Sequence, residues 1–135
     1  MFPKSELRQH IIKLAQEVLT DVVESPENHV FDHIPMTESD YPFIAVAECF
    51  EENTSTSTRT LVRDNFIIHV FNYWEKTTET EKIIYELSKA IYENDNSGNW
   101  IWLVTKCNSE YTGEYDKEFN MYLGHAILDI TLENS

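Results

Sequence analysis

The spacing of hydrophobic residues changes along this chain from a helical period to a strand period and back, and this succession limits the possible folds. From Ser5 to Glu24, apolar residues recur at every third or fourth position, which is typical of an amphipathic helix. From Arg59 to Tyr73, apolar residues recur at every second position, which is typical of a strand. The sequence therefore predicts that helices and strands pack together.

The first helix is predicted from a stripe of six apolar residues: Leu7, Ile11, Leu14, Ala15, Val18 and Val22. Ser5 can cap its beginning, and Glu6 suits the positive N-terminal end of the helix dipole. Ser25-Pro26 ends it, because a residue before proline avoids the helical conformation.

A second helix is predicted after residue 78, where Thr78 and Glu81 have the spacing of a capping box. Its apolar stripe consists of Ile83, Ile84, Leu87, Ala90 and Ile91. The run Asn94-Asp95-Asn96-Ser97-Gly98 ends this helix, since Asn and Gly readily adopt turn conformations.

The remaining apolar segments predict strands. A brief strand is expected at Val30-Phe31 and a mostly buried one at 41–50, followed by a polar hairpin loop at 51–58. The segment 59–73 is expected to be the longest strand, with a second face that something partly covers. Two more strands are expected at 100–107 and 120–132, joined by a polar loop at 108–118.

The predicted order is α-β-β-β-α-β-β within one domain that spans residues 1–135. Strands that follow one another through polar loops favour a mainly antiparallel sheet of about five strands. Two helices then pack on one face of that sheet, so the fold class is α+β.

Charge and cysteine content exclude several classes of protein. The chain has 24 acidic and 10 basic residues, a net charge of −14 that is spread along the sequence, which disfavours nucleic-acid binding. Its longest apolar run, 43–47, is far shorter than a membrane span. Cys49 and Cys107 lie far apart in a chain without an export leader, so both are expected to be reduced.

The sequence offers no strong catalytic or cofactor motif. Three glycines cannot form a dinucleotide fingerprint or a P-loop. His29 and His33 have metal-ligand spacing only on a helix, which Pro26 and Pro35 make improbable; in a strand their side chains would be about 13 Å apart. We therefore expect no enzyme activity, no cofactor and no metal.

Two other groups of residues receive structural interpretations. His69 and His125 fall on predicted strands without a neighbour at ligand spacing, so packing or solvent contact is the better interpretation. The aromatic residues Phe71, Tyr73, Trp74, Trp100 and Trp102 could stack on bases, but they lack the basic groove that accompanies such platforms.

The order of these segments resembles the tail completion proteins of long-tailed bacteriophages, also called tail terminators or head–tail joining proteins. The resemblance rests on an N-terminal helix, the phrase Val30-Phe31-Asp32-His33-Ile34-Pro35, and the block Tyr41-Pro42-Phe43-Ile44-Ala45-Val46. It continues through a Thr/Ser-rich hairpin, a strand that ends Ile67-Ile68-His69-Val70-Phe71-Asn72, the second helix and a last strand at 122–132. Where the family usually has an Arg-rich segment before that strand, this chain has 110–118 with several acids.

This resemblance implies a structural virion protein that caps the head-proximal end of the tail tube and joins the tail to the head. Its partners would be other copies of itself in a ring, commonly of six, the tail tube protein and the head connector protein. DNA would pass through the ring without specific binding, and no membrane would be involved. The protein would be located in the virion, and in the host cytoplasm during assembly.

Acidic loops could serve such a ring by repelling phosphates as DNA slides through the lumen. The candidate residues for the lumen or for partner contacts are Glu51, Glu52, Thr54, Ser55, Thr56, Glu110, Glu114 and Asp116. A DNA-mimicking inhibitor of a DNA-binding enzyme is the alternative, and it would require carboxylates spaced like phosphates. An enzyme of unknown type would require a deep pocket with convergent polar groups.

Overall fold

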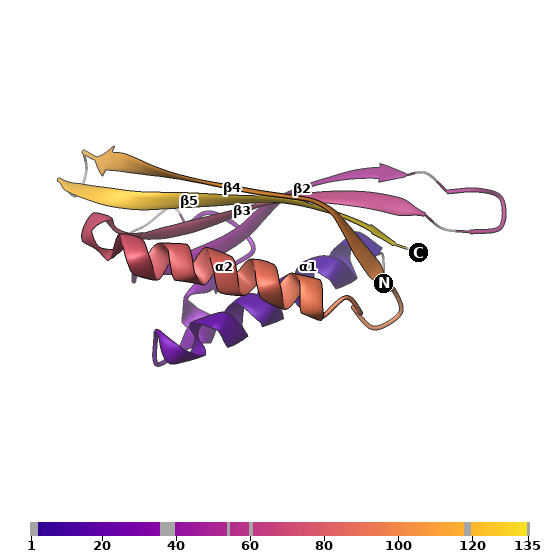
Figure 1. Ribbon diagram of the computed structural model, residues 1–135, viewed down its shortest axis with the longest axis horizontal. Helices are drawn as coiled ribbons and strands as arrows, with labels where there is room; N and C mark the ends of the chain where they lie inside the picture. Colours follow the sequence, from indigo (N-terminus) through magenta and orange to yellow (C-terminus); the bar gives the residue numbers. More distant parts are fainter. Residues whose placement is uncertain (1–2, 36–39, 54, 60, 118–119, 135) are drawn as a thin grey trace.

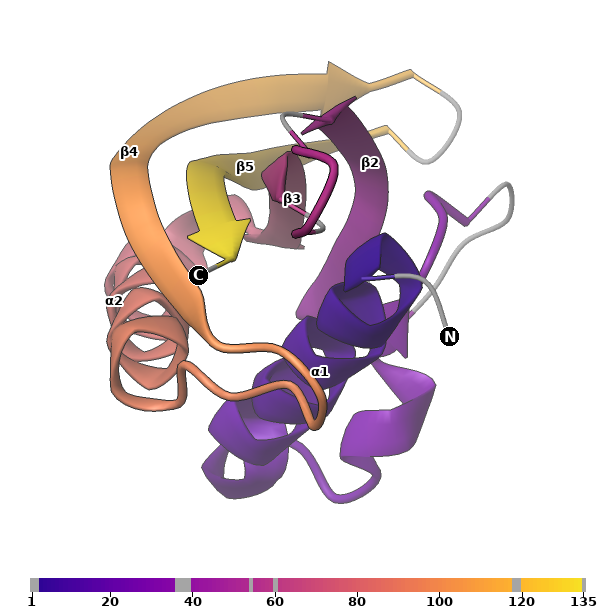
Figure 2. The same cartoon turned by 90° about the vertical axis from the view of Figure 1, so that its right-hand side faces the viewer.

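The computed structural model describes residues 3–35, 40–53, 55–59, 61–117 and 120–134. A curved five-stranded sheet forms one layer, and two helices cover one of its faces (Figures 1 and 2). The strand order is β1-β2-β3-β5-β4, and only β1 runs parallel to its neighbour. The predicted α+β class, the element order and the placement of both helices on one face are confirmed.

The helices are α1 (Pro3–Val18) and α2 (Thr77–Glu93), with short 3-10 turns at Leu19–Asp21, Pro26–Asn28 and Trp74–Lys76. The strands are β1 (Val30–Phe31), β2 (Phe43–Asn53), β3 (Val62–Tyr73), β4 (Trp102–Asp116) and β5 (Met121–Asn134). Within the part of the chain just defined, no helix is long and apolar enough to cross a lipid bilayer.

Helix α1 is shorter than predicted. It ends at Val18 rather than Glu24, and the chain continues in a 3-10 turn in which the Val22 and Val23 amides both donate to the Leu19 carbonyl oxygen. Pro26 follows shortly after this turn, so the last part of the predicted helix is a tighter 3-10 turn and the α-helix does not continue.

Helix α2 begins without the predicted capping box. Lys76 occupies the N-cap position, its side chain makes no capping hydrogen bond, and Thr78 lies inside the helix. The hydroxyls of Thr77 and Thr80 donate instead to the carbonyl oxygens of Trp74 and Lys76, at 2.9 and 3.0 Å. The 3-10 turn at 74–76 thus leads directly into the α-helix.

Strands β2, β3 and β4 begin two or three residues later than predicted, but β2 and β4 extend well beyond their predicted ends. β2 continues to Asn53 and β4 to Asp116, so segments expected to be polar loops are strands instead. β4 has fifteen residues and β3 twelve, which makes the prediction that β3 is the longest strand wrong. Polar residues fit these strands because both described helices lie on the other face of the sheet, which leaves this face open to solvent (Figure 1).

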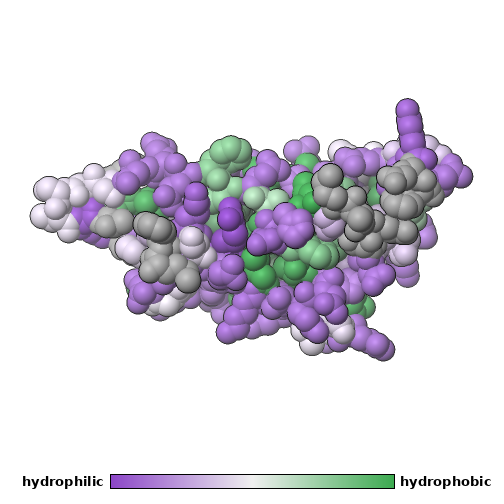
Figure 3. Space-filling view, turned by 180° about the vertical axis from the view of Figure 1, so that it is seen from behind, coloured by the Kyte–Doolittle hydropathy of each residue, from purple (hydrophilic) through white to green (hydrophobic). Residues whose placement is uncertain are grey.

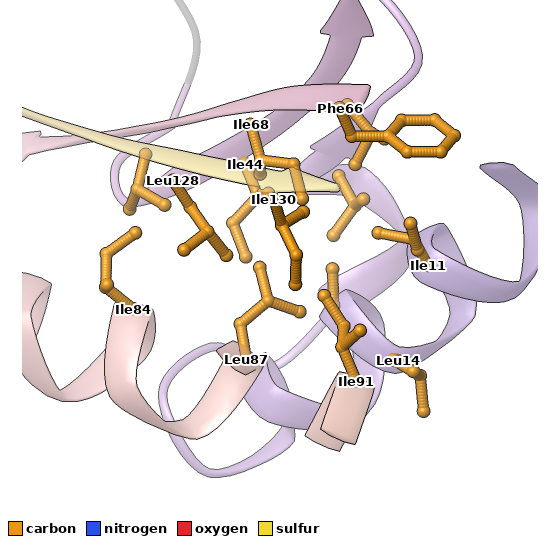
Figure 4. Packing of buried hydrophobic residues seen from close by; sticks show 14 of the residues in the cluster. Ile11, Leu14, Ile44, Phe66, Ile68, Ile84, Leu87, Ile91, Leu128 and Ile130 are labelled. Carbon is orange, nitrogen blue, oxygen red and sulfur yellow. The ribbon is translucent and has the colours of Figure 1, made fainter. Parts of the chain in front are cut away.

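The hydrophobic core fills the space between the sheet and the two helices (Figure 4). Ile11 and Leu14 reach it from α1, and Leu87 and Ile91 from α2. The sheet contributes alternate residues of its strands, including Ile44, Phe66, Ile68, Leu128 and Ile130. This packing leaves the opposite side of the sheet to carry polar groups.

Candidate functional site

The side of the sheet that faces away from both helices is called here the open face. Because side chains alternate along a strand, the pairing registers show which residues belong to it. Its members are Phe43, Ala45, Glu48, Phe50 and Glu52 of β2; Arg63, Asn65, Ile67, His69, Phe71 and Tyr73 of β3; Leu123, His125, Ile127, Asp129, Thr131 and Glu133 of β5; and Leu103, Lys106, Asn108, Glu110, Thr112, Glu114 and Asp116 of β4.

Two β-bulges determine which acids reach the open face. One lies between Val46 and Glu48, and the other between Val104 and Lys106. Without the extra residue in each strand, simple alternation would turn Glu48 and Glu114 toward the helices. The bulges thus place both carboxylates on the same side as the histidines of β3 and β5.

A row of four side chains crosses the open face from β2 to β4. His69 Nδ1 lies 2.8 Å from His125 Nε2, so the two rings are in direct hydrogen-bond contact. His69 Nε2 lies 2.8 Å from Glu48 Oε1, and His125 Nδ1 lies 2.7 Å from Glu114 Oε1. This row, Glu48–His69–His125–Glu114, is called here the histidine relay.

Aromatic rings cover the two histidines of the relay, whereas the side chains of Glu48 and Glu114 are 47% and 53% exposed. Phe71 stacks on His125 with ring centroids 4.1 Å apart and an angle of 12° between the planes. Phe43 stacks on Phe71 in turn, with a centroid distance of 5.0 Å. Both histidines are only 8% exposed, although neither of the described helices covers this face. The partial cover that the sequence predicted is therefore provided by neighbouring side chains of the sheet itself.

His69 and His125 are packed side chains, in line with their interpretation from the sequence, but they also contact each other, which the sequence did not predict. Alternation places each of them opposite the apolar stripe of its strand, so their shared face could be read from the sequence. Their contact depends on the pairing of β3 with β5, which are separated along the chain by α2 and β4. Local spacing contains no signal for that pairing.

The predicted acids do not form one cluster. Glu52, Glu110, Glu114 and Asp116 belong to the open face, whereas Glu51 pairs with Asp64 on the opposite side. Glu110 and Asp116 were expected in a loop but lie in β4. The register places Glu52 and Glu114 ten residues apart along β5, which corresponds to about 33 Å.

The predicted Thr/Ser residues of the hairpin have local partners. The Ser55 amide donates to Asn53 Oδ1 at 2.8 Å, and its hydroxyl accepts from the Leu61 amide at 3.0 Å. Thr56 Oγ1 accepts from the Arg59 amide at 3.2 Å. These contacts shape the tip between β2 and β3, and Thr54 lies outside the described residues.

Several charges of the open face are paired within the chain. Arg63 forms ion pairs with Glu52, at 3.5 Å, and with Glu133. Lys106 Nζ lies 3.2 Å from Asp129, which also accepts from Asn65 Nδ2 at 2.6 Å. From the side shown in Figure 3, hydrophilic residues cover most of the molecule around a smaller hydrophobic patch. Arg63 and Lys106 thus pair with part of the acidic surplus of the open face.

On the helix side of the sheet, Asp64 is fully buried next to Glu51. Burial, and secondly the neighbouring Glu51 carboxylate, raise the pKa of Asp64 to about 8. Cys49 lies close by in β2, where burial and the Asp64 charge raise the pKa of its thiol to about 12. Both shifts disfavour additional negative charge at this end of the core.

His29 and His33, which the sequence analysis considered as metal ligands, contact different partners. His29 Nδ1 contacts the Pro42 carbonyl oxygen at 2.7 Å, and His33 Nδ1 contacts Asp32 Oδ1 at 2.8 Å. Among residues 3–35, 40–53, 55–59, 61–117 and 120–134, no three His, Cys, Asp or Glu side chains are grouped to hold a metal ion. Cys49 and Cys107 are free thiols.

No protein-family model and no curated protein matches this chain. A similar solved structure is a chain in the structure described as "Virion of native gene transfer agent (GTA) particle". The likeness has a TM-score of 0.59 at 12% sequence identity, and it covers 93% of this chain and 91% of the other. At that identity, the likeness shows a common fold.

Proposed function

We propose that this protein is a structural component of the virion of a long-tailed phage or a phage-like particle. In this proposal it caps the head-proximal end of the tail tube and joins the tail to the head connector. The observation that carries the proposal is the likeness to a chain of a gene transfer agent particle, which extends over 93% of this chain. The position at the head-proximal end of the tail is supported by the order of the sequence segments, which resembles tail completion proteins.

Two unlike open edges of the sheet support assembly into a ring. Within the described residues, β4 pairs only with β5, and β2 beyond Ala45 pairs only with β3. These edges lie on opposite sides of the sheet, and the β2–β3 hairpin projects past the helices (Figure 1). A contact between one edge and the other edge of the next copy is head-to-tail, the kind of contact that closes rings.

The open face offers a surface for the lumen of such a ring. Glu52, Glu110, Glu114 and Asp116 share it, and carboxylates along a DNA channel would repel the phosphates that slide past. Glu51 is no longer a candidate for the lumen, because it lies beside Asp64 on the other side of the sheet.

The pairing of charges disfavours the alternative of a DNA mimic. A mimic needs carboxylates free to occupy the positions of phosphates. On the open face, Glu52, Glu133 and Asp129 contact Arg63 or Lys106, while Glu48 and Glu114 contact histidines. These intramolecular partners hold the carboxylates in place within the sheet, whereas a mimic needs them free to match the positions of phosphates.

The helix side likewise gives little support to catalysis. A groove of about 700 Å³ runs between α1 and α2, and seven charged residues contribute to its lining. None of the seven is buried. Enzyme sites instead bring a few polar groups together in a mostly apolar, enclosed pocket.

Deletion of the gene tests the proposed position. Particles assembled without the protein should have full heads that lack tails, or tails of abnormal length, when viewed by cryo-electron microscopy. Complementation with the wild-type gene should restore joined particles. Normal tails on full heads in the deletion strain would refute the assignment.

Charge reversal tests the lumen hypothesis separately. Replacement of Glu52, Glu110 and Asp116 by lysine should reduce DNA delivery while joined particles still form. The matched control replaces Glu81 and Glu93, two exposed acids of α2, by lysine. Equal delivery by both variants and the wild type would exclude a lumen role for the open face.

A further inference from the structure

The three contacts of the histidine relay need more hydrogens than its groups ordinarily carry. Each contact, Glu48–His69, His69–His125 and His125–Glu114, requires one hydrogen between its two polar atoms. Two neutral imidazoles provide two hydrogens, and ionised carboxylates provide none. One contact would therefore bring two lone pairs together at hydrogen-bond distance.

The two contacts with the carboxylates show which of the three contacts lacks a hydrogen. If His69 Nε2 and His125 Nδ1 donate to the two carboxylates, then the neutral rings face each other with bare nitrogens 2.8 Å apart. A third hydrogen between these nitrogens removes the repulsion and completes all three hydrogen bonds. Imidazole is a stronger base than a carboxylate, so the hydrogen belongs on the rings.

A fourth hydrogen breaks the same contact. With both rings doubly protonated, two N–H groups would point at each other across the distance between His69 and His125. The geometry of the relay therefore fits one number of bound hydrogens, three, and neither two nor four.

The surroundings favour a single positive charge on the pair. Glu48 faces the pair from β2, and Glu114 faces it from β4. The other charged residues of the open face are Glu52, Arg63, Lys106, Glu110, Asp116, Asp129 and Glu133. No described helix packs on this side, and the Phe71 ring stacked on His125 also attracts a cation to its face.

We propose that His69 and His125 together bind one proton beyond those of two neutral rings, held between His69 Nδ1 and His125 Nε2. This proton links strands β2, β3, β5 and β4 through one continuous row of hydrogen bonds. The inference is independent of any role of the protein in a virion.

Nitrogen-15 NMR of the folded protein, labelled at histidine, tests the proposal directly. At neutral pH, the spectra should show three hydrogens on the four ring nitrogens of this pair, with a hydrogen-bond coupling between His69 Nδ1 and His125 Nε2. Two hydrogens on the four nitrogens in the folded wild-type protein would overturn the proposal.

Charge-removing variants test the cause. Glu48→Gln and Glu114→Gln each keep an oxygen that accepts from the ring but remove the negative charge, so the affinity for the third proton should fall about tenfold or more. The matched control is Glu52→Gln, on the same strand and face but paired with Arg63. Equal effects of all three variants would refute a specific proton site, and the wild-type spectrum remains decisive if a variant does not fold.

Discussion

At the scale of single residues, Asp64 is the group whose environment most opposes its usual charge. It is fully buried beside Glu51, and both of its carboxyl oxygens are shielded from water. Burial and the adjacent Glu51 raise its pKa from 3.8 to about 8, so the folded protein holds a proton that the unfolded chain releases. This residue therefore lowers the stability of the fold as the pH rises from about 4 to about 8.

Asp64→Asn should remove this pH dependence, because asparagine does not titrate. The variant should gain stability relative to the wild type as the pH increases from about 4 to about 8, by on the order of a few kcal/mol. Urea unfolding at several pH values measures the difference. The control is Asp21→Asn, at an exposed position, and a gain in Asp64→Asn no larger than the change in this control would contradict the assigned burial effect.

Cys49 should be a slow nucleophile. Its thiol pKa of about 12, against an ordinary 9.0, reduces the reactive thiolate at pH 8 by roughly 1,000-fold. In a Cys107→Ser background, alkylation of the folded protein should be slower than that of the urea-denatured protein by about that factor. Comparable rates in the two states would show that the thiol is neither buried nor influenced by Asp64.

At the scale of elements, the two bulges mark the places where alternation along a strand fails to predict which face a side chain occupies. In β3 the alternation that predicted a strand at 59–73 holds throughout, and the two sets of side chains lie on opposite faces. In β2 and β4, one extra residue reverses the alternation, so Glu48, Glu110 and Glu114 lie on the side opposite to that predicted by simple alternation. A bulge depends on hydrogen bonding between strands, which a single sequence does not specify.

Gly113 of β4 lies close to the side chain of Trp74, and this contact can be tested by substitution. Gly113 lies opposite Gly124, and a Cβ atom built on Gly113 would lie 2.6 Å from Trp74 Cζ3. Gly113→Ala should therefore destabilise the protein by about 1–3 kcal/mol, because the indole must move.

A double-mutant cycle with Trp74→Ala isolates this contact. Once the indole is removed, Gly113→Ala should cost little, since alanine is otherwise preferred to glycine within a strand. Chemical denaturation of the four proteins gives the coupling energy. Equal costs of Gly113→Ala in both backgrounds would mean that Trp74 is not the obstacle.

At the scale of the whole molecule, the helices and the α+β order followed from the sequence because burial of one face imposes a period on each element. The histidine relay did not follow, because its four members come from four strands whose order in space differs from their order in the chain. The core depends on local patterns of hydrophobicity, whereas the relay depends on register, and register is a property of the assembled sheet.

The net charge of −14 predicts how salt affects assembly. The direction of the salt effect distinguishes repulsion between copies from attraction by ion pairs. A ring places several strongly acidic copies side by side, so long-range repulsion opposes its closure, and salt weakens that repulsion. Sedimentation velocity should show more oligomer in about 0.5 M than in about 20 mM NaCl.

Glu81→Gln combined with Glu93→Gln, which lowers the negative charge on the exposed side of α2, should allow oligomers at lower salt. Oligomers that dissociate as salt increases would instead require interfaces held by ion pairs between copies, and the open strand edges would no longer be sufficient to explain the ring.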